Sequence, residues 1–106
     1  MGFFDFLKQP DISQGLKQYN TTSGAILLDV RTPQEYAEGH IPGGQNLSLQ
    51  NIDKAADIIY NKDAPLFVYC LSGTRSRQAA AVLKQMGYTN VTNIGGIADY
   101  RGKVER

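Results

Sequence analysis

Two short, almost continuous apolar runs are the feature that most limits how this chain can fold. They are AILLDV at residues 25–30 and LFVY at residues 66–69, and residues 91–94 form a weaker third run. Strands of a parallel sheet are covered on both faces, so they are typically apolar throughout and do not alternate with polar residues. The sequence therefore predicts strands that are buried in the middle of a layered structure.

The segments around these runs have helical periodicity. Asp11 can cap a helix with Ile12, Leu16 and Tyr19 on one face, and Thr32-Pro33-Gln34-Glu35 is a capping box with proline in the first turn. Two later segments have apolar residues at helical spacing: Ile52, Ala55, Ala56 and Ile59, then Ala79, Val82, Leu83 and Met86, with Gly87 placed to end the second. This alternation predicts an α/β fold of three layers, a central, mostly parallel sheet with helices on both faces.

Length and composition indicate one globular domain over residues 1–106, because a chain of 106 residues can bury one core and not two. The apolar fraction of 42% and charged fraction of 20% argue against a disordered, fibrous or membrane protein. The net charge is +1, and the basic residues are interleaved with acidic ones without forming a basic stripe. We therefore expect a monomer that binds neither nucleic acid nor a membrane.

The first residues, MGFFDFL, contain an apolar run that is too short for a signal peptide or a spanning helix and is interrupted by Asp5. Gly2 does not complete a myristoylation motif, because Phe6 stands where that motif has Ser or Thr. These features predict a cytoplasmic protein. We expect the three phenylalanines of this segment to pack on the core and not to form an exposed patch.

Cys70 is the only cysteine of the chain and His40 the only histidine, so we expect no internal disulfide, no metal site and no cofactor. Ligands of open parallel sheets bind beyond the carboxyl ends of the strands, where Cys70 follows the second run and Asp29 and Arg31 end the first. The segment after Cys70 contains a glycine turn and leads directly into a predicted helix.

Backbone N–H groups of such a turn, together with the helix dipole, favour a negative charge on the Cys70 sulfur. Arg75 adds a cation five residues on, which also favours the thiolate. A buried core cysteine is the alternative, because LFVYC suits the interior of a strand and free cysteines are commonly buried. The glycine and the cation after Cys70 favour the functional interpretation.

Over about residues 11–102 the sequence resembles the rhodanese family. Three segments carry the resemblance: LLDVRTPQEYAEGHIPGGQNL at residues 27–47, VYCLSGTRS at 68–76 and NIGGIADYRG at 93–102. The resemblance implies a rhodanese-like fold and a sulfurtransferase of the thiosulfate sulfurtransferase class. It implies that Cys70 takes sulfane sulfur from a donor such as thiosulfate as a persulfide, then passes it to a thiophilic acceptor such as cyanide, a small thiol or a protein thiol.

The resemblance also assigns site residues by position. The loop that would bind the persulfide comprises Leu71, Ser72, Gly73, Thr74, Arg75 and Ser76, whose N–H groups would surround the outer sulfur. The hydroxyls of Ser72, Thr74 and Ser76 either donate to the sulfur or are solvated. Asp29, Arg31, Glu38 and His40 match signature positions: Asp29 is expected to fix a neighbouring group, His40 to bond backbone, and Arg31 either to bind an anion or to form a structural ion pair.

Three departures from the family pattern bear on these expectations. The loop CLSGTR differs from CRKGVT and CGSGVT, which are found in members that act on thiosulfate or mercaptopyruvate, so the donor stays open. Tyr100 stands where the family usually has tryptophan, which we expect to alter packing and not chemistry. The sequence holds no second cysteine to resolve a persulfide, so an outside acceptor must do so.

Two other functions are compatible with a cysteine in such a loop. A cysteine-dependent phosphatase or arsenate reductase has five residues between Cys and Arg, whereas Cys70 and Arg75 enclose four, which gives a ring better suited to a single sulfur. A catalytically idle rhodanese-like binding or regulatory module is the second alternative. Such modules usually lack the cysteine that this chain retains.

Overall fold

Helices and strands alternate along the chain in the computed structural model, which describes residues 10–106. In chain order the elements are α1 (Ile12–Thr21), β1 (Ile26–Asp29), α2 (Pro33–Glu38), β2 (Gly44–Asn46), the 3₁₀ helix η2 (Leu49–Asp57), β3 (Leu66–Cys70), α3 (Thr74–Gln85), β4 (Val91–Gly96) and the 3₁₀ turn η3 (Ile97–Asp99). The phenylalanines that we expected to pack on the core lie outside the described residues. Among residues 10–106, no helix is long and apolar enough to cross a membrane.

The central sheet has four strands in the order β2-β1-β3-β4, and all three pairings are parallel. The two strong apolar runs form β1 and β3, the two middle strands. Middle strands are covered on both faces of the sheet, so apolar residues are favoured at every position. The sequence did not indicate β2, because this strand has only three residues and no apolar run. Its register against β1 pairs Leu27 with Gly44.

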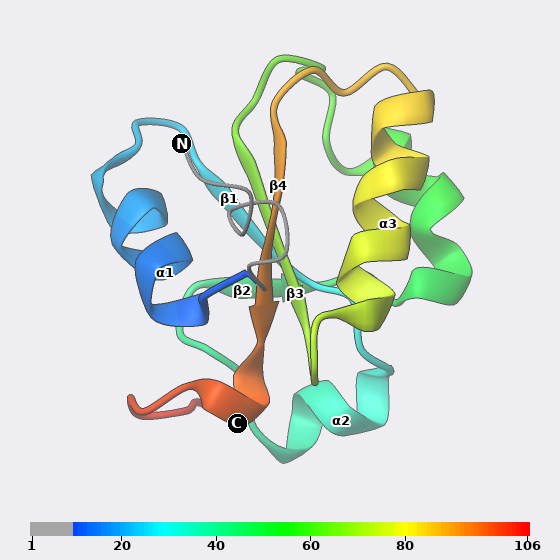
Figure 1. The fold of residues 1–106 in the computed structure, drawn as a ribbon. Helices are drawn as coiled ribbons and strands as arrows, with labels where there is room; N and C mark the ends of the chain where they lie inside the picture. Colours follow the sequence, from blue (N-terminus) through cyan, green and yellow to red (C-terminus); the bar gives the residue numbers. More distant parts are fainter. Residues whose placement is uncertain (1–9) are drawn as a thin grey trace, which may run out of the picture.

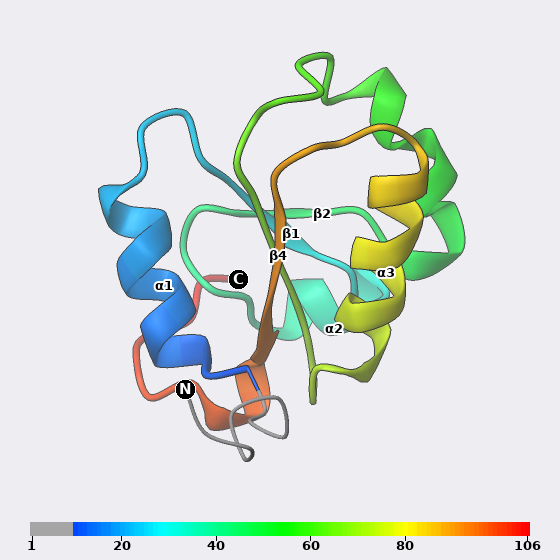
Figure 2. The ribbon, with the colours of Figure 1, turned by 45° about the horizontal axis from the view of Figure 1, so that its top comes forward.

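Helices cover both faces of this sheet, which confirms the predicted three layers (Figures 1 and 2). Helix α1 lies on one side, and α3 with η2 on the other. The α1 side buries Ile12, Leu27, Ile41, Phe67, Tyr69 and Ile94, and the α3 side buries Leu28, Val30, Val68, Cys70, Ala79 and Leu83 with their neighbours. Successive strand residues point to opposite faces, so Cys70 belongs to the α3 side and Tyr69 to the α1 side.

The predicted helix ends are present in the structure. The backbone N–H of Ser13 donates to the Asp11 carboxylate at 3.0 Å, and Thr32 and Glu35 form the reciprocal capping box with proline in the first turn. Gly87 directly follows the cap of α3 with a φ of +103°, a conformation that residues with a Cβ rarely adopt.

One prediction from helical spacing is wrong. Ala56 was placed on the buried face with Ile52 and Ala55, but it is exposed. The segment forms a 3₁₀ helix with about three residues per turn, so residues three apart share a face and a residue four apart does not. Non-helical backbone angles at Asn51 mark a kink within this segment.

Candidate active site

Cys70 is the last residue of β3 and is 1% exposed, with the start of α3 only four residues further on. Gly73 makes this short connection possible, because it caps α3 with a φ of +101°. In this conformation its backbone N–H donates to the Cys70 sulfur at 3.0 Å. Figure 1 shows α2 and the first turn of α3 at the end of the sheet where β3 and β4 finish. The site therefore lies at the carboxyl end of parallel strands, as expected.

Ser76 provides the hydroxyl at the sulfur. It is buried in the first turn of α3, and its Oγ lies 3.4 Å from Cys70 Sγ, within the hydrogen-bond range for sulfur. Ser72 and Thr74 are exposed, and within residues 10–106 neither hydroxyl bonds to the sulfur. Of the three hydroxyls considered from the sequence, the structure brings only that of Ser76 to Cys70.

The loop lowers the pKa of the Cys70 thiol below its ordinary value. Burial alone would raise this pKa, but the Ser76 hydroxyl and the backbone N–H groups of Ser76, Gly73 and Ser72 outweigh it by donating to the sulfur. The N-terminus of α3 adds the positive end of its dipole at the same place. This surrounding favours a thiolate, the nucleophilic form of cysteine.

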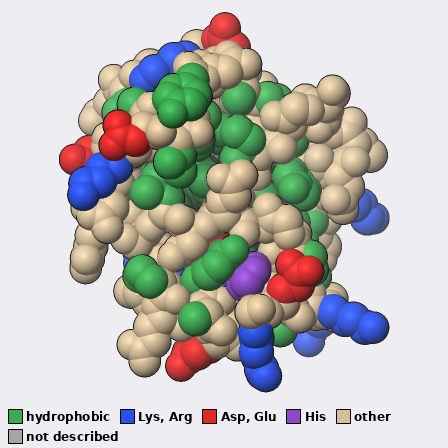
Figure 3. Space-filling model, turned by 180° about the vertical axis from the view of Figure 1, so that it is seen from behind, with side chains coloured by type: hydrophobic (Ala, Val, Ile, Leu, Met, Phe, Trp, Pro, Cys, Tyr) green, Lys and Arg blue, Asp and Glu red, His purple; other side chains and the backbone are tan. Residues whose placement is uncertain are grey.

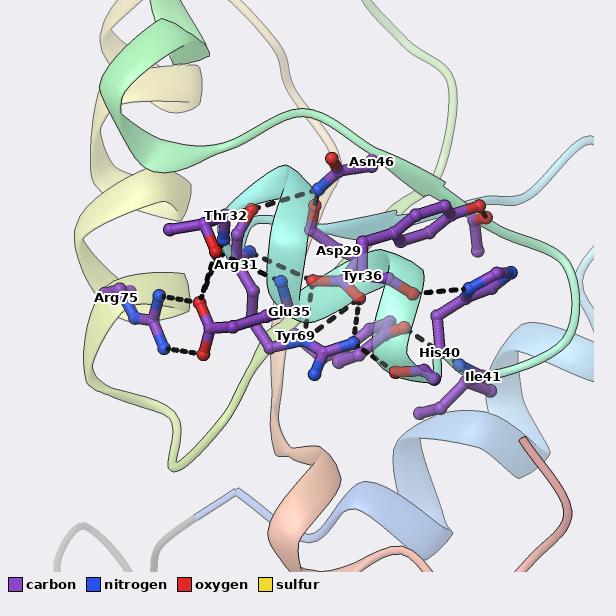
Figure 4. Close-up of polar contacts among 12 residues, drawn as sticks. Asp29, Arg31, Thr32, Glu35, Tyr36, His40, Ile41, Asn46, Tyr69 and Arg75 are labelled. Atoms are coloured by element: carbon purple, nitrogen blue, oxygen red, sulfur yellow. Dashed lines mark hydrogen bonds and ion pairs between the residues drawn. The ribbon is translucent and has the colours of Figure 1, made fainter. Parts of the chain in front are cut away.

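Arg75, which the sequence offered as a cation near Cys70, is paired with a carboxylate. Its guanidinium binds Glu35 of α2 through both terminal nitrogens, at 2.7 and 3.0 Å (Figure 4). The same carboxylate accepts from the N–H and hydroxyl of Thr32 in the capping box. Hydrogen bonding to Arg75 lowers the pKa of Glu35 to about 2. The charge of Arg75 is therefore partly offset by Glu35, and the hydrogen bonds to the sulfur are the main cause of the lowered pKa of Cys70.

Asp29 and Arg31 form a buried ion pair at the end of β1 (Figure 4). The guanidinium meets both carboxylate oxygens, at distances from 2.6 to 3.1 Å, and also donates to the Gly39 carbonyl at 2.8 Å. The backbone N–H of Arg31 donates to the same carboxylate. These contacts bond both carboxylate oxygens of Asp29 and the Nε and Nη2 atoms of Arg31, which favours the structural interpretation of Arg31.

His40 bonds to the backbone. Its Nδ1 lies 3.0 Å from the Tyr36 carbonyl oxygen, and because a carbonyl only accepts, Nδ1 must be the protonated nitrogen. The imidazole stacks on the Tyr36 ring with a centroid distance of 3.7 Å, and part of it is visible at the surface in Figure 3. Figure 4 shows His40 on the far side of the Asp29 and Arg31 pair from Arg75. The side chain of nearby Glu38 is exposed.

Gly95 and Gly96 of the NIGG segment lie directly against the backbone of the loop that follows Cys70. A Cβ at Gly96 would overlap the Leu71 carbonyl oxygen and the Ser72 Cα, so only glycine fits there. The Leu71 carbonyl in turn accepts from the Ala98 N–H at 3.1 Å. The Leu71 side chain is exposed at the site, so the loop is fixed by its backbone.

Glu35 and Asn93 are site residues that sequence reasoning missed. Glu35 was assigned only to the capping box, although it also binds the loop arginine. Asn93 belongs to a segment that was quoted for the resemblance, and its side chain contacts both Ser76 and Gly73. Neither contact has a local signal, because the partners are 40, 17 and 20 residues apart in the sequence.

A cavity of about 130 Å³ lies beside Arg75, lined by Val30, Thr32, Ser48, Leu49, Gln50 and Arg75. Cys70 is not among these lining residues. A larger cavity of about 600 Å³ lies between α1 and β4, and Cys70 does not line it. Among residues 10–106, His, Cys, Asp and Glu side chains form no group of three that could hold a metal ion.

Comparison with known proteins agrees with this geometry. The family model of the rhodanese-like domain matches residues 11–103. Thiosulfate sulfurtransferase PspE of Escherichia coli K12 is 38% identical over 73 residues, which are 68% of this chain and 70% of that protein. Thiosulfate sulfurtransferase GlpE of Pseudomonas fluorescens Pf-5 is 39% identical over 90 residues, 82% of this chain and 75% of that protein.

The fold is also that of solved rhodaneses. An E. coli rhodanese structure superposes with a TM-score of 0.71 at 34% identity, covering 77% of this chain and 98% of that one. The family model spans most of the chain and includes the Cys70 loop. From its sequence segments, its fold and these matches, the chain belongs to the rhodanese-like domain family.

Proposed function

We propose that this protein is a sulfurtransferase that moves a sulfane sulfur from a donor such as thiosulfate to a thiophilic acceptor through a persulfide on Cys70. One observation carries the proposal: the Cys70 sulfur accepts hydrogen bonds from the Gly73 N–H and the Ser76 hydroxyl at the N-terminus of α3. The relatives named thiosulfate sulfurtransferases support the same reaction class.

The first step loads the sulfur. The Cys70 thiolate attacks the outer sulfur of thiosulfate, a new S–S bond forms, and the bond between the two thiosulfate sulfurs breaks. Sulfite leaves with that electron pair, and the terminal persulfide sulfur keeps one negative charge. The N–H groups of residues 72, 73 and 76 face this end of the site and would offset that charge.

The second step releases the sulfur. An acceptor such as cyanide attacks the terminal sulfur with its own electron pair, and the S–S bond breaks so that Cys70 returns to the thiolate. Thiocyanate is the product in this case, and a small thiol or a protein thiol would receive the sulfur in the cell. Neither step needs a general base once the thiol is ionised. We expect the reaction to run in the cytoplasm, where thiols are kept reduced.

The persulfide itself gives the decisive experiment. After incubation with thiosulfate, intact-protein mass spectrometry should detect one added sulfur that maps to Cys70 and is removed by cyanide or dithiothreitol. Cys70→Ser should abolish both the adduct and thiocyanate production. Ser72→Ala is a matched control, because the Ser72 hydroxyl is exposed and does not bond to the sulfur.

Other outcomes would overturn the proposal. If thiosulfate, mercaptopyruvate and a low-molecular-weight persulfide all fail to load the protein, sulfur transfer is wrong and a binding module takes its place. Hydrolysis of an aryl phosphate without a sulfur adduct would identify a phosphatase. Thiocyanate production that is unchanged in Cys70→Ser would exclude Cys70 as the sulfur carrier.

A further inference from the structure

The side-chain amide of Asn93 connects three parts of the Cys70 site. Its Oδ1 accepts from the Ser76 hydroxyl at 2.7 Å and from the Gly95 N–H at 3.0 Å. Its Nδ2 lies 3.3 Å from the Gly73 carbonyl oxygen, to which it donates. Two donors on one end and an acceptor at the other fix the orientation of the amide.

An irregularity in β4 accompanies this arrangement. In the pairing of β3 with β4, Val68 lies opposite Asn93 and Tyr69 lies opposite Gly95, so Ile94 is an extra residue. Bulges of this kind bend a strand and reorient its backbone and side chains. Ile94 packs into the α1 side of the core, while Asn93 meets α3. The bulge therefore turns the Gly95 N–H toward Asn93.

The Ser76 hydroxyl has a single proton but several acceptors around it. Asn93 Oδ1 is nearest at 2.7 Å, followed by the Gly73 carbonyl at 3.1 Å, the Cys70 sulfur at 3.4 Å and the Gly95 carbonyl at 3.5 Å. When Cys70 is a neutral thiol, its S–H can donate to Ser76 Oγ while the Ser76 proton points to Asn93. An anionic sulfur has no proton and accepts more strongly than an amide oxygen.

We propose that Asn93 is a positioning residue. Its Oδ1 accepts the hydrogen bond of the Ser76 hydroxyl while the Cys70 sulfur is neutral, and the hydroxyl turns to donate to the sulfur when the sulfur becomes anionic. No proton leaves Ser76 in this exchange, because the O–H only rotates about the Cβ–Oγ bond. After the rotation Asn93 Oδ1 still accepts from the Gly95 N–H, so it is not left unsatisfied. The Ser76 proton thus follows the charge on the sulfur.

This arrangement has a consequence for ionisation. The bond between Ser76 and Asn93 stabilises only the neutral form of the site, so its loss should favour the thiolate. A purely structural role predicts the reverse, since loosening the loop would return the thiol toward its ordinary behaviour. Nearby charges do not alter this comparison: Arg75 with Glu35 and Asp29 with Arg31 are paired, and the substitutions below leave them in place.

The test is the pH profile of Cys70 alkylation by iodoacetamide. Asn93→Leu removes the acceptor without a gap for water, and it should move the midpoint downward by roughly half to one pH unit. Asn93→Asp keeps an acceptor and adds a negative charge, so it should move the midpoint upward. Thr92→Ala is the control on the same strand, because the Thr92 side chain is exposed, and it should leave the profile unchanged.

Ser76→Ala completes the design, because Asn93 is proposed to act through this hydroxyl. In that background Asn93→Leu should no longer move the midpoint downward. An upward shift or no shift for Asn93→Leu in the otherwise unchanged protein would overturn the proposal. If Asn93→Leu does not fold, the upward shift caused by Asn93→Asp must shrink in the Ser76→Ala background, and an undiminished shift refutes it.

A kinetic readout links this inference to the proposed sulfur transfer, on which it rests. Without the Asn93 acceptor, the Ser76 hydroxyl should stay hydrogen-bonded to the persulfide and stabilise it. Asn93→Leu should therefore slow sulfur release to cyanide about threefold or more, with little change in KM for thiosulfate. Alkylation needs no sulfur donor, so the two proposals can fail separately. Absence of any persulfide would refute sulfur transfer, whereas a persulfide with an unshifted alkylation profile would refute only the role of Asn93.

Discussion

Glu35→Gln tests how the capping box of α2 and the Cys70 loop depend on one carboxylate. Glutamine can still accept from the N–H and hydroxyl of Thr32, because a capping box admits either residue. It cannot form the ion pair with Arg75, which Glu35 makes at 2.7 Å. The substitution therefore removes the charge of the pair and keeps the helix cap.

The size of the effect follows from the pKa of Glu35. Hydrogen bonding to Arg75 lowers this pKa from 4.5 to about 2 in the folded protein, which by linkage would stabilise the fold by about 3 kcal/mol at neutral pH. The side chains of Arg75 and Glu35 are 34% and 28% exposed, so solvent screening reduces this value. We expect Glu35→Gln to lower the free energy of unfolding by about 1 kcal/mol at pH 7.

The pH dependence provides the sharper measurement. A carboxylate whose pKa is lower in the folded protein contributes stability above its unfolded pKa and loses it as the pH falls toward the folded value. In urea unfolding, the gap of about 1 kcal/mol between the two proteins should stay nearly constant from pH 7 to 5 and shrink by roughly four-fifths by pH 3.5. Glu38→Gln, an exposed site in the same helix, is the control. A gap independent of pH, or an equal gap in the control, would refute this reasoning.

Two further predictions concern the loop. In a thiocyanate assay, Gly96→Ala should reduce sulfur transfer at least tenfold, because the added Cβ would overlap the Leu71 carbonyl. Gly24→Ala is the control: Gly24 has open space around it but a positive φ. In urea unfolding this control should lose about 1 kcal/mol of stability, and its turnover should stay unchanged. Replacing Arg75 by Ala together with Glu35→Gln should change the rate of Cys70 alkylation at pH 7 by less than about threefold, since the two charges already offset each other. A tenfold fall would instead make Arg75 the source of the thiolate.

The parts of the fold that depend on local sequence could be predicted. Unbroken apolar runs marked β1 and β3, and the caps at Asp11 and Thr32 marked helix starts, because these signals act over a few residues. Cys70 could be placed at the sheet end because a strand, a glycine and a helix follow one another there. Ala56 could not be placed correctly, since the choice of a 3₁₀ helix depends on what the segment packs against.

The contacts that complete the site could not be predicted in the same way. β2 is held by its pairing with β1 and not by its own three residues, of which one is glycine. The pairing of Arg75 with Glu35 could not be predicted, because the two residues are 40 positions apart. Asn93 gave no signal, because an asparagine within a short strand indicates nothing by itself until the structure places it beside Ser76.

The position of Gly95 and Gly96 beneath the Cys70 loop affects the order in which the protein can become active during synthesis. The loop is made early relative to β4, and the ribosome delivers the chain from its N-terminus. A nascent chain that has emerged only as far as α3 contains Cys70 but lacks the strand on which the loop rests and the Ala98 N–H that holds it. Its thiol should behave as an ordinary cysteine at that stage. Sulfur loading should therefore begin only after residue 98 has left the exit tunnel, and a released chain that ends at residue 90 should remain unloaded by thiosulfate.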